Sequence, residues 1–453
     1  MARCCLLATS LCALLLTPVL ADEGMWLFNA VPRDKIKAAY GFEPSQEWLD
    51  HVRLSSVRFN NGGSGSFVSA DGLTFTNHHV ASECIHQLSS EGKDFLKTGY
   101  QARSRADEAK CPDLELNVLQ DLEDVTARVN AGVKPKMSAA EAGQAQRSAM
   151  SAIEKECAAA TGLRCDVVTF YAGGAYHLYK YKKYTDVRLV FAPESDIAFF
   201  GGDPDNFNFP RYDLDVAFFR VYENDQPAAT PHHLKWSKTG VKEGDLVFVS
   251  GHPGSTGRLK SMAELEFLRD VNYPFLLKSY QRRIALHKKF AAESAENARI
   301  AADNIQGLEN SFKAVTGYLA GLIDEWLMGA RQADEDELRA AAKTKDLETA
   351  FKEIEQAMET QKQIFLPYTF LERTGTRGVP AGFRGELSFR ARRLVRAAAE
   401  RARPNAARLR EFRDSALPSL EQELFSTAPI YKSLETLLLA DSLAEMRDHM
   451  GAG

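Results

Sequence analysis

The sequence has few cysteines, seven in 453 residues, and it contains neither a Cys-x-x-Cys pair nor a His-Glu-x-x-His motif. Because these motifs carry common structural and catalytic zinc sites, we expect no metal and no organic cofactor. Charge of one sign is also not in large excess, since the net charge is only −5. The sequence therefore gives no electrostatic reason to expect a nucleic-acid partner.

Long hydrophobic runs are absent as well. The apolar run from Cys4 to Leu16 is too short for a comfortable membrane span, and no later run is long enough, so we expect no membrane partner. Arg3 precedes this run and small residues follow it up to Ala21, which is typical of a secretory signal peptide over residues 1–21. We expect a periplasmic or secreted protein whose mature chain begins at Asp22.

Three of the cysteines lie in the predicted signal peptide, which leaves four. Four cysteines in an exported protein suggest two disulfides. Nearness in the sequence favours pairing Cys84 with Cys111 and Cys157 with Cys165. No repeat of 20–50 residues and no low-complexity linker is apparent.

The first domain, residues 22–272, is predicted to be rich in β-strands. Short apolar stretches bounded by Gly, Pro and Asp turns are typical of an antiparallel barrel or sandwich. A helical excursion is expected near residues 121–162, where the composition changes and Ser138 with Glu141 forms a capping box. The predicted strands cover residues 73–76, 166–171, 184–191, 216–221 and 246–250.

The second domain, residues 273–453, is predicted to be helical, which makes the fold class α+β. Within it, apolar residues recur at spacings of three and four, as on one face of a helix. This predicted stripe consists of Leu308, Phe312, Val315, Leu319, Leu322 and Trp326.

The stretch 71–81 combines an Asp-Gly turn, a short strand and the paired residues His78 and His79. A histidine at the end of a barrel strand is where serine proteases hold their general base, which makes His79 the candidate and His78 its structural neighbour. A packed turn and half of a metal site are the alternatives. Adjacent side chains on a strand point to opposite faces, so these two rings cannot easily share one metal ion.

A second constellation precedes the strand at 216–221, where Asp205, Asp213 and Asp215 follow one another closely. A catalytic triad needs a carboxylate that accepts the imidazole N–H and fixes its tautomer. Asp215 fits this role because it stands directly before the predicted strand. Alternatively, Asp213 and Asp215 are turn residues, and Asp203 with Asp205 belongs to a calcium loop.

Several short motifs taken together resemble one family. They are Gly24-Met25-Trp26, Thr76-Asn77-His78-His79, Cys111-Pro112, Glu115-Leu116-Asn117, Phe200-Gly201-Gly202-Asp203, Asp205-Asn206, Pro210-Arg211 and Ser250-Gly251-His252-Pro253-Gly254. From about Gly24 to the last residues, the chain resembles the bacterial dipeptidyl peptidases 7 and 11, which are periplasmic serine peptidases. The resemblance implies a chymotrypsin-like β-barrel catalytic region, here with an incomplete second barrel, and a large inserted α-helical cap domain.

The resemblance also implies an activity and the residues that carry it. Members release dipeptides from the free N-terminus of oligopeptides, and they tend to form homodimers. His79 matches the general base and Asp215 the triad acid. Asn206 and Asn310 match residues that hold the α-amino group of the substrate, and Phe207 stands where relatives usually have Trp.

The serine nucleophile is missing from the expected place. The resemblance puts it in a Gly-Asn-Ser-Gly-Ser-Pro-like turn after the helical insertion, and the sequence up to Gly453 has no such turn. The loop Gly63-Ser64-Gly65-Ser66 precedes the histidine, and Ser250 and Ser255 lack a matching motif. We therefore expect a fragment or a truncated gene, inactive alone, since loss of a triad nucleophile costs about 10⁶-fold in rate. The alternatives are a periplasmic serine endopeptidase and a non-catalytic peptide-binding protein.

Overall fold

The computed structural model describes residues 25–254, 257, 259–341, 345–373 and 380–451. The predicted signal peptide lies outside these residues. The chain divides into two compact units, Met1–Leu49 and Asp50–Gly453. Within the described part of the chain, no helix combines the length and the apolar character that crossing a membrane would require.

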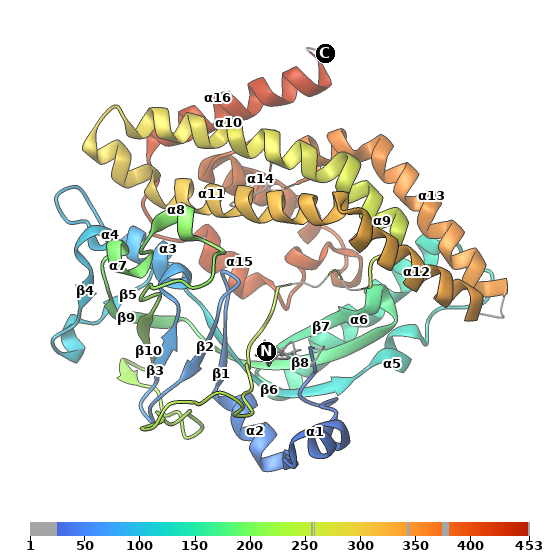
Figure 1. The fold of residues 1–453 in the computed structure, drawn as a ribbon, viewed down its shortest axis with the longest axis horizontal. Coiled ribbons are helices and arrows are strands. Elements are labelled where there is room, and N and C mark those ends of the chain that lie inside the picture. Colours follow the sequence, from blue (N-terminus) through green and yellow to red (C-terminus); the bar gives the residue numbers. More distant parts are fainter. Residues whose placement is uncertain (1–24, 255–256, 258, 342–344, 374–379, 452–453) are drawn as a thin grey trace, which may run out of the picture. The chain divides into compact units, whose positions relative to one another are not determined.

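One antiparallel sheet of eleven strands organises the second unit (Figure 1). The strands are β1 (Ser56–Phe59), β2 (Ser64–Phe67), β3 (Leu73–Thr76), β4 (Tyr100–Gln101), β5 (Ala109–Lys110), β6 (Leu116–Asp124), β7 (Arg164–Phe170), β8 (Ala175–Tyr184), β9 (Asp186–Ala192), β10 (Ala217–Glu223) and β11 (Gln226–Pro227). The order along the sheet is β4-β9-β10-β3-β2-β1-β6-β8-β7, with β5 beside β9 and β11 beside β10. This order brings β3 and β10 together although about 140 residues separate them, and that pairing positions the site described below.

Helices account for most of the chain from residue 262 onward. The helices before it are α1 (Arg33–Tyr40), α2 (Gln46–Ser55), α3 (His78–Leu88), α4 (Phe95–Thr98), α5 (Thr126–Asn130), α6 (Ala139–Thr161), α7 (Ser195–Ala198) and α8 (Gly202–Asp205). Those after it are α9 (Met262–Phe267), α10 (Tyr273–Ala291), α11 (Ala295–Ile323), α12 (Glu325–Ala341), α13 (Lys345–Pro367), α14 (Glu386–Arg401), α15 (Leu417–Leu424) and α16 (Lys432–Met450).

The predicted hairpin around the Asp-Gly turn is confirmed. Strand β2 pairs with β3 in the register Gly65 with Thr76 and Phe67 with Thr74. Gly72 has a φ of +80°, and a Cβ there would lie 2.8 Å from the carbonyl oxygen of Val221, so the turn requires glycine. The expectation that the paired histidines end a strand is wrong, because His78 and His79 are instead the first two residues of helix α3.

The core under this hairpin joins the sheet to α3. Its fully buried members include Val57 and Phe59 of β1, Phe219 of β10 and Ile85 of α3. Burial of this apolar face holds the start of α3 at the end of β3, at roughly 25 cal/mol for each Å² removed from water.

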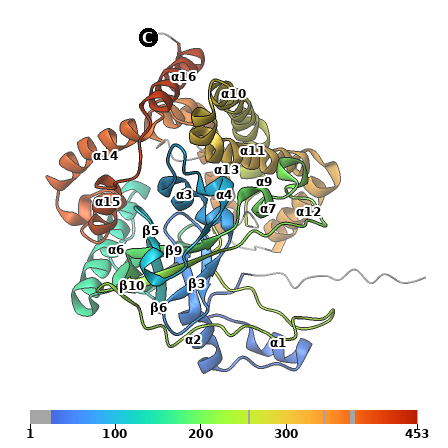
Figure 2. The same ribbon diagram turned by 90° about the vertical axis from the view of Figure 1, so that its left-hand side faces the viewer.

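Helix α11 lies beside α10 and next to α3 (Figures 1 and 2). The predicted apolar stripe places Leu308 and Val315 in a buried cluster with Tyr280. The last member of the predicted stripe is wrong. Trp326 belongs to α12 and is 77% exposed, because α11 ends at Ile323 and the chain turns at Asp324.

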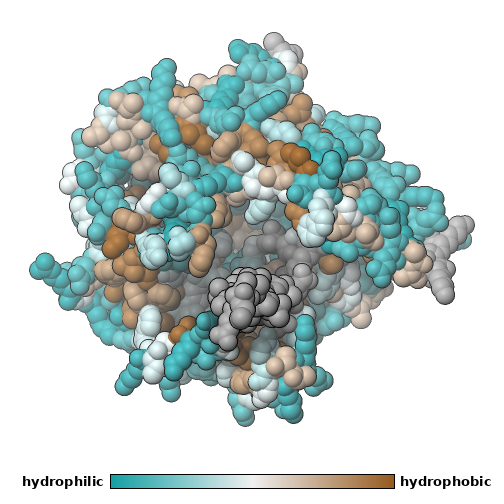
Figure 3. All heavy atoms as spheres, viewed as in Figure 1, coloured by the Kyte–Doolittle hydropathy of each residue, from teal (hydrophilic) through white to brown (hydrophobic). Residues whose placement is uncertain are grey.

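Hydrophobic side chains reach the surface in several patches of the face that Figure 3 shows. The predicted strand at residues 246–250 is wrong, because this apolar segment is exposed and does not form a strand. Val247 is 59% and Val249 99% exposed, and no strand pairs with the segment among the described residues. A run of residues with high strand propensity forms a strand only where a neighbouring strand supplies hydrogen-bonding and packing partners.

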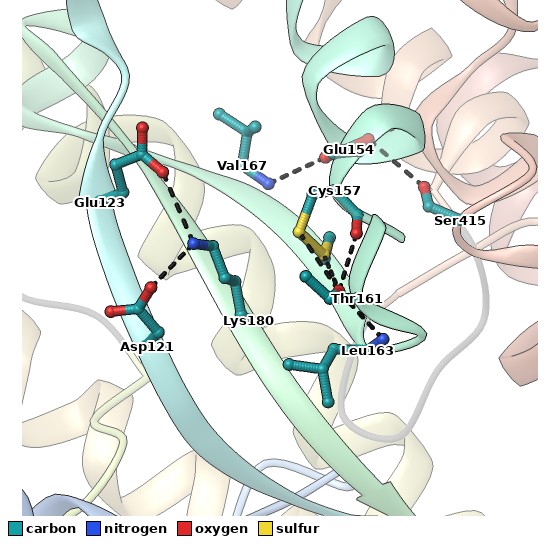
Figure 4. Close-up of a disulfide and its surroundings, with 10 residues drawn as sticks. Asp121, Glu123, Glu154, Cys157, Thr161, Leu163, Val167, Lys180 and Ser415 are labelled. Carbon is teal, nitrogen blue, oxygen red and sulfur yellow. Dashed lines mark hydrogen bonds and ion pairs between the residues drawn. A yellow bond between two sulfur atoms is a disulfide. The ribbon is translucent and has the colours of Figure 1, made fainter. Parts of the chain in front are cut away.

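The helical excursion begins later than predicted, because residues 121–124 still belong to β6. Helix α6 starts at the predicted capping box, in which the backbone N–H of Ser138 donates to Glu141 at 2.8 Å. Both preferred disulfides are confirmed, Cys84–Cys111 and Cys157–Cys165. The second ties the end of α6 to β7 (Figure 4).

Candidate active site

The side chains of His79 and Asp215 meet where β3 and β10 pair. Thr76, which ends β3, lies opposite Ala217, which begins β10, so the residues flanking this pair are close. The Nδ1 atom of His79 lies 2.6 Å from Oδ2 of Asp215. A carboxylate can only accept, so Nδ1 carries a proton, and in the neutral form of the ring Nε2 has a free lone pair. The His79 side chain is 62% exposed, which leaves its outer edge open to another molecule.

Asp215 also closes the N-terminus of α3. Its Oδ1 accepts the backbone N–H of His79 at 3.0 Å, and the side-chain amide of Asn77 donates to Oδ2 at 3.2 Å. Asn77 itself makes no side-chain cap to the helix. A carboxylate at a helix N-terminus satisfies a free N–H and interacts well with the helix dipole, so the same contacts orient the ring and begin the helix.

Opposing effects act on the Asp215 carboxyl. Burial works to raise its pKa, but the hydrogen bonds from the His79 ring and backbone outweigh burial and hold the pKa below its ordinary value. The carboxylate is therefore charged at neutral pH and can stabilise a positive charge on the imidazole. His78, the first residue of α3, is buried, and burial lowers its pKa, so it is a neutral packing neighbour.

The helical region contacts the His79-bearing helix through Asp303 of α11. The Oγ of Ser82 donates to Oδ1 of Asp303 at 2.8 Å and also lies 3.0 Å from the carbonyl oxygen of His79. Both Ser82 and Asp303 are buried. A charge-assisted hydrogen bond in a buried place fixes the distance between two elements better than an exposed contact does.

Asn206 and Asn310 also meet, although 104 residues separate them. The side-chain N–H of Asn206 donates to Oδ1 of Asn310 at 2.9 Å. Arg211 donates to Oδ1 of Asn206 at 3.0 Å. Each amide oxygen has a second lone pair, so both oxygens can still accept from a donor such as an ammonium group. Asn206 is 5% exposed, whereas Asn310 is exposed.

Phe207 is exposed beside this pair, with a φ of +62°. A bulky residue in the left-handed region is strained, and such strain is concentrated at functional sites. The guanidinium of Arg211 lies 4.9 Å from the centre of the Phe199 ring and 3.0 Å from Asp213. These contacts hold Arg211 against Asn206.

Four residues that the sequence analysis assigned no role support these groups: Asn77, Arg211, Asp303 and Lys313. The ammonium group of Lys313 contacts the carbonyl oxygens of Asp203 and Pro204, just before Asn206. Asp303, Asn310 and Lys313 are spaced by seven and three residues, so they share one face of α11. That spacing was the available signal for Asp303 and Lys313. The sequence signal for Arg211 was its place in the short motif Pro210-Arg211.

The serines considered in the sequence have other contacts. Ser64 accepts the backbone N–H of His252 at 2.8 Å, and the hydroxyl of Ser56 donates to that of Ser250 at 2.8 Å. Ser255 lies outside the described residues. Within the described ranges no serine hydroxyl is bonded to Nε2 of His79, and no group of three or more His, Cys, Asp or Glu side chains is arranged to hold a metal ion.

A histidine that is hydrogen-bonded to a carboxylate at the ends of two paired strands, with a helical region reaching it, is an arrangement that hydrolases use. The family model described as Peptidase S46 matches residues 21–453. The chain therefore belongs to the peptidase family S46. The predicted resemblance to dipeptidyl peptidases 7 and 11 is confirmed by the relatives described next.

Curated relatives carry two names. The chain is 31% identical to dipeptidyl-peptidase 7 of Phocaeicola vulgatus over 406 residues, which is 83% of this chain and 56% of the relative. It is 32% identical to the Asp/Glu-specific dipeptidyl-peptidase of Shewanella putrefaciens over 364 residues, or 76% and 49%. The crystal structure of Porphyromonas endodontalis DPP11 in complex with the dipeptide Arg-Asp matches with a TM-score of 0.74 at 23% identity, covering 95% of this chain and 64% of that one. The chain thus spans about half the length of these curated relatives and shares the DPP11 fold.

Proposed function

We propose that this chain carries the general-base part of a serine-type dipeptidyl-peptidase, which releases dipeptides from the free N-terminus of oligopeptides. The contact of 2.6 Å between Nδ1 of His79 and Oδ2 of Asp215, in a member of the S46 family, is the observation that carries the proposal. Curated relatives over this length are named dipeptidyl-peptidases, which supports the same reaction class.

In this proposal Asp215 holds the His79 ring in the tautomer whose Nε2 takes a proton from an attacking hydroxyl. The imidazolium that forms is stabilised by the Asp215 carboxylate and then protonates the leaving amine. The described residues bring no serine to His79, so we propose that the hydroxyl comes from outside them. Without it we expect binding of peptides but no turnover.

Asn206 and Asn310 would receive the α-amino group of the substrate, with Phe207 as an apolar wall beside it. An ammonium group needs acceptors that are held in place, and hydrogen bonds to a charged group contribute about 1.5–3 kcal/mol each. Arg211 and Lys313 hold the Asn206 segment from two sides, which supports a preformed site. Helix α11 carries Asn310 and also contacts α3, the helix that carries His79. The position of α11 would therefore set the distance between the proposed amine site and His79.

Further parts of the proposal concern architecture and location. The strands between residues 56 and 227 would belong to a chymotrypsin-like β-barrel region, and residues 273–453 would cap it as an inserted helical domain. The fold shared with DPP11 supports this architecture. The two disulfides support export to the periplasm or out of the cell behind a signal peptide at residues 1–21. Homodimer formation is proposed only from the resemblance.

Calorimetry with a matched pair of peptides tests the amine site. We expect the 453-residue chain to bind a tetrapeptide with a free N-terminus and an amidated C-terminus, and to bind its N-acetylated form at least tenfold more weakly. Asn310→Ala should reduce the affinity for the free form about tenfold, since it removes one hydrogen bond to a charged group. Equal affinity for the two peptides would refute the assignment of Asn206 and Asn310.

An assay of dipeptide release tests the catalytic part. We expect no release by this chain. Release that disappears in His79→Ala would support His79 as the general base, but it would contradict the proposal that the attacking hydroxyl comes from outside the described residues. Cleavage of N-acetylated peptides would favour a serine endopeptidase, and tight binding without cleavage, even with a nucleophile-bearing segment supplied, would favour a non-catalytic peptide-binding protein.

A further inference from the structure

A cavity of about 850 Å³ lies between the sheet side and the helical side of the second unit. On the sheet side it is lined by α3 and by the turns around residues 60–62 and 113–115. On the helical side it is lined by α10, α11, α14, α15 and α16. Figure 1 shows α10, α11, α14 and α16 above α3. A volume of 300–1,000 Å³ is the usual size of a site for a small organic molecule.

Most charged side chains that line the cavity already have a partner of opposite charge. The pairs are Arg164 with Glu115 at 2.6 Å, Arg390 with Glu386 at 2.7 Å and Arg393 with Glu423 at 3.3 Å. Apolar walls lie between them, formed by Leu114, Ile300, Phe389, Leu420, Leu434 and Leu438. Four further carboxylates line it, Glu83, Asp113, Glu411 and Glu435, so carboxylates outnumber arginines, and one cationic group of the lining has no carboxylate bonded to it among the described residues.

Arg283 of α10 is that group. It lines the cavity, is only 7% exposed, and its Nε and Nη1 atoms are buried without a hydrogen-bond partner among the described residues. Arg384 lies nearby and likewise keeps Nε and Nη1 unpaired, although its Nη2 bonds to Asp441 and to Glu445 at 3.0 Å. Burial, together with the charge of Arg384, lowers the pKa of Arg283 to about 10. A buried guanidinium without an acceptor is costly unless a ligand supplies one.

We propose that this cavity binds an organic anion whose oxyanion group is received by the buried guanidinium of Arg283. The planar fork of Arg matches the two oxygens of a carboxylate or phosphate, and the apolar walls would hold the body of the ligand. The volume exceeds what an inorganic ion fills. The proposal uses neither His79 nor the asparagine pair, and it stands whether or not the chain acts on peptides.

The first experiment is calorimetry with N-acetyl-Ala-Ala, which has a carboxylate and no free amine, and with its C-terminal amide. The acetyl group excludes the proposed amine site, so a failure of that site does not affect the result. We expect the acid to bind at least tenfold more tightly than the amide, and inorganic phosphate to compete with the acid. Equal binding of acid and amide, absence of binding by the acid up to millimolar concentration, or binding of phosphate alone would overturn the proposal.

The second experiment uses two arginines of the same helix. Arg283→Met should reduce the affinity for the acid at least tenfold and raise the melting temperature without ligand, because it removes a buried guanidinium that has two nitrogens without a hydrogen-bond partner among the described residues. Arg282, one residue earlier, is bonded to Asp441 at 2.7 Å and Asp448 at 3.1 Å, so Arg282→Met should keep the affinity. Arg283→Lys retains the charge without the fork and should bind with intermediate affinity. Unchanged affinity in Arg283→Met, or equal losses in both methionine variants, would contradict the role of Arg283.

Discussion

At the scale of single residues, Asp215 has two tasks that depend on the same charge. One oxygen accepts from the ring of His79 and the other from its backbone N–H, so the group that orients the base also begins the helix that carries it. Because Asp215 accepts the first N–H of the helix, Asn77 at the N-cap position does not cap α3 and instead donates its side-chain amide to Asp215. The ring and the helix start cannot shift independently.

Substitution of Asp215 should therefore affect stability as well as chemistry. We expect Asp215→Ala to lower the free energy of unfolding by about 1–2 kcal/mol at pH 7, the usual cost of losing a cap. Asp215→Asn keeps an acceptor and loses the charge, so its cost should be smaller, about 0.3–1 kcal/mol. Urea unfolding monitored by circular dichroism measures both differences.

The effect of pH on this difference follows from the lowered pKa of Asp215 in the folded state. The stabilisation is present above the ordinary value near 3.8 and is lost as the pH falls through the lower, folded value. The difference in the free energy of unfolding between wild type and Asp215→Asn should thus be at its full value at pH 7 and become smaller below pH 3.8. A gap that stays constant down to acid pH would show that the charge of Asp215 does not contribute.

At the scale of elements, α11 connects the parts of the site. Asp303 reaches α3, Asn310 reaches Asn206, and Lys313 reaches the end of α8, all from one face of the helix. A helix is stiff over this length, so these contacts set the spacing between His79 and the asparagine pair.

Removal of the Lys313 contact should loosen the segment that it holds. We expect Lys313→Met to speed amide hydrogen exchange in residues 202–208 severalfold and to leave exchange in β1 unchanged, because the contact is local. Lys352→Met is the matched control, since among the described residues Lys352 is bonded within its own helix α13, to Glu348 at 2.7 Å. Equal exchange in both variants would contradict a supporting role for Lys313.

The two disulfides close loops of different size, with separations of 27 and 8 residues. Loop-closure entropy predicts a stabilisation of about 3.5 kcal/mol for Cys84–Cys111 and about 2.5 kcal/mol for Cys157–Cys165. Replacing both cysteines of one pair by serine should show this order in urea unfolding. The first pair also ties α3 to the strand region, so its loss should disturb the His79 helix, whereas loss of the second should not. The reverse order would mean that native-state contacts outweigh the entropy of the unfolded chain.

At the scale of the whole molecule, the apolar surface at residues 246–250 stands out. Val249 is 99% exposed and Val247 59%, although the segment consists of residues with high strand propensity. Exposed apolar segments with strand propensity favour association between chains. We expect Val249→Lys to raise the concentration at which the protein aggregates, measured by light scattering, with no change in the circular dichroism spectrum. Val221→Lys, a change in the buried core, is the control that should unfold the protein.

The sequence alone determined those features that depend on neighbours in the chain. The capping box at Ser138, the hairpin at Gly72 and both disulfides follow from local spacing, and His79 and Asp215 stood out by their positions beside strands. The same local rules failed where a partner was needed. Residues 246–250 have the pattern of a strand but no adjacent strand among the described residues, and the histidines continue into a helix because Asp215 caps it.

The tertiary structure alone decided which distant groups meet. No local pattern joins Asn206 to Asn310 or Asp303 to Ser82, because these contacts depend on how the helices pack against the sheet. The same packing leaves two nitrogens of Arg283 without a hydrogen-bond partner among the described residues. Sequence patterns report the preference of each segment for a conformation and for burial. The contacts between segments are fixed only when the apolar faces pack, and that packing places the polar groups of α10 and α11 where they lie.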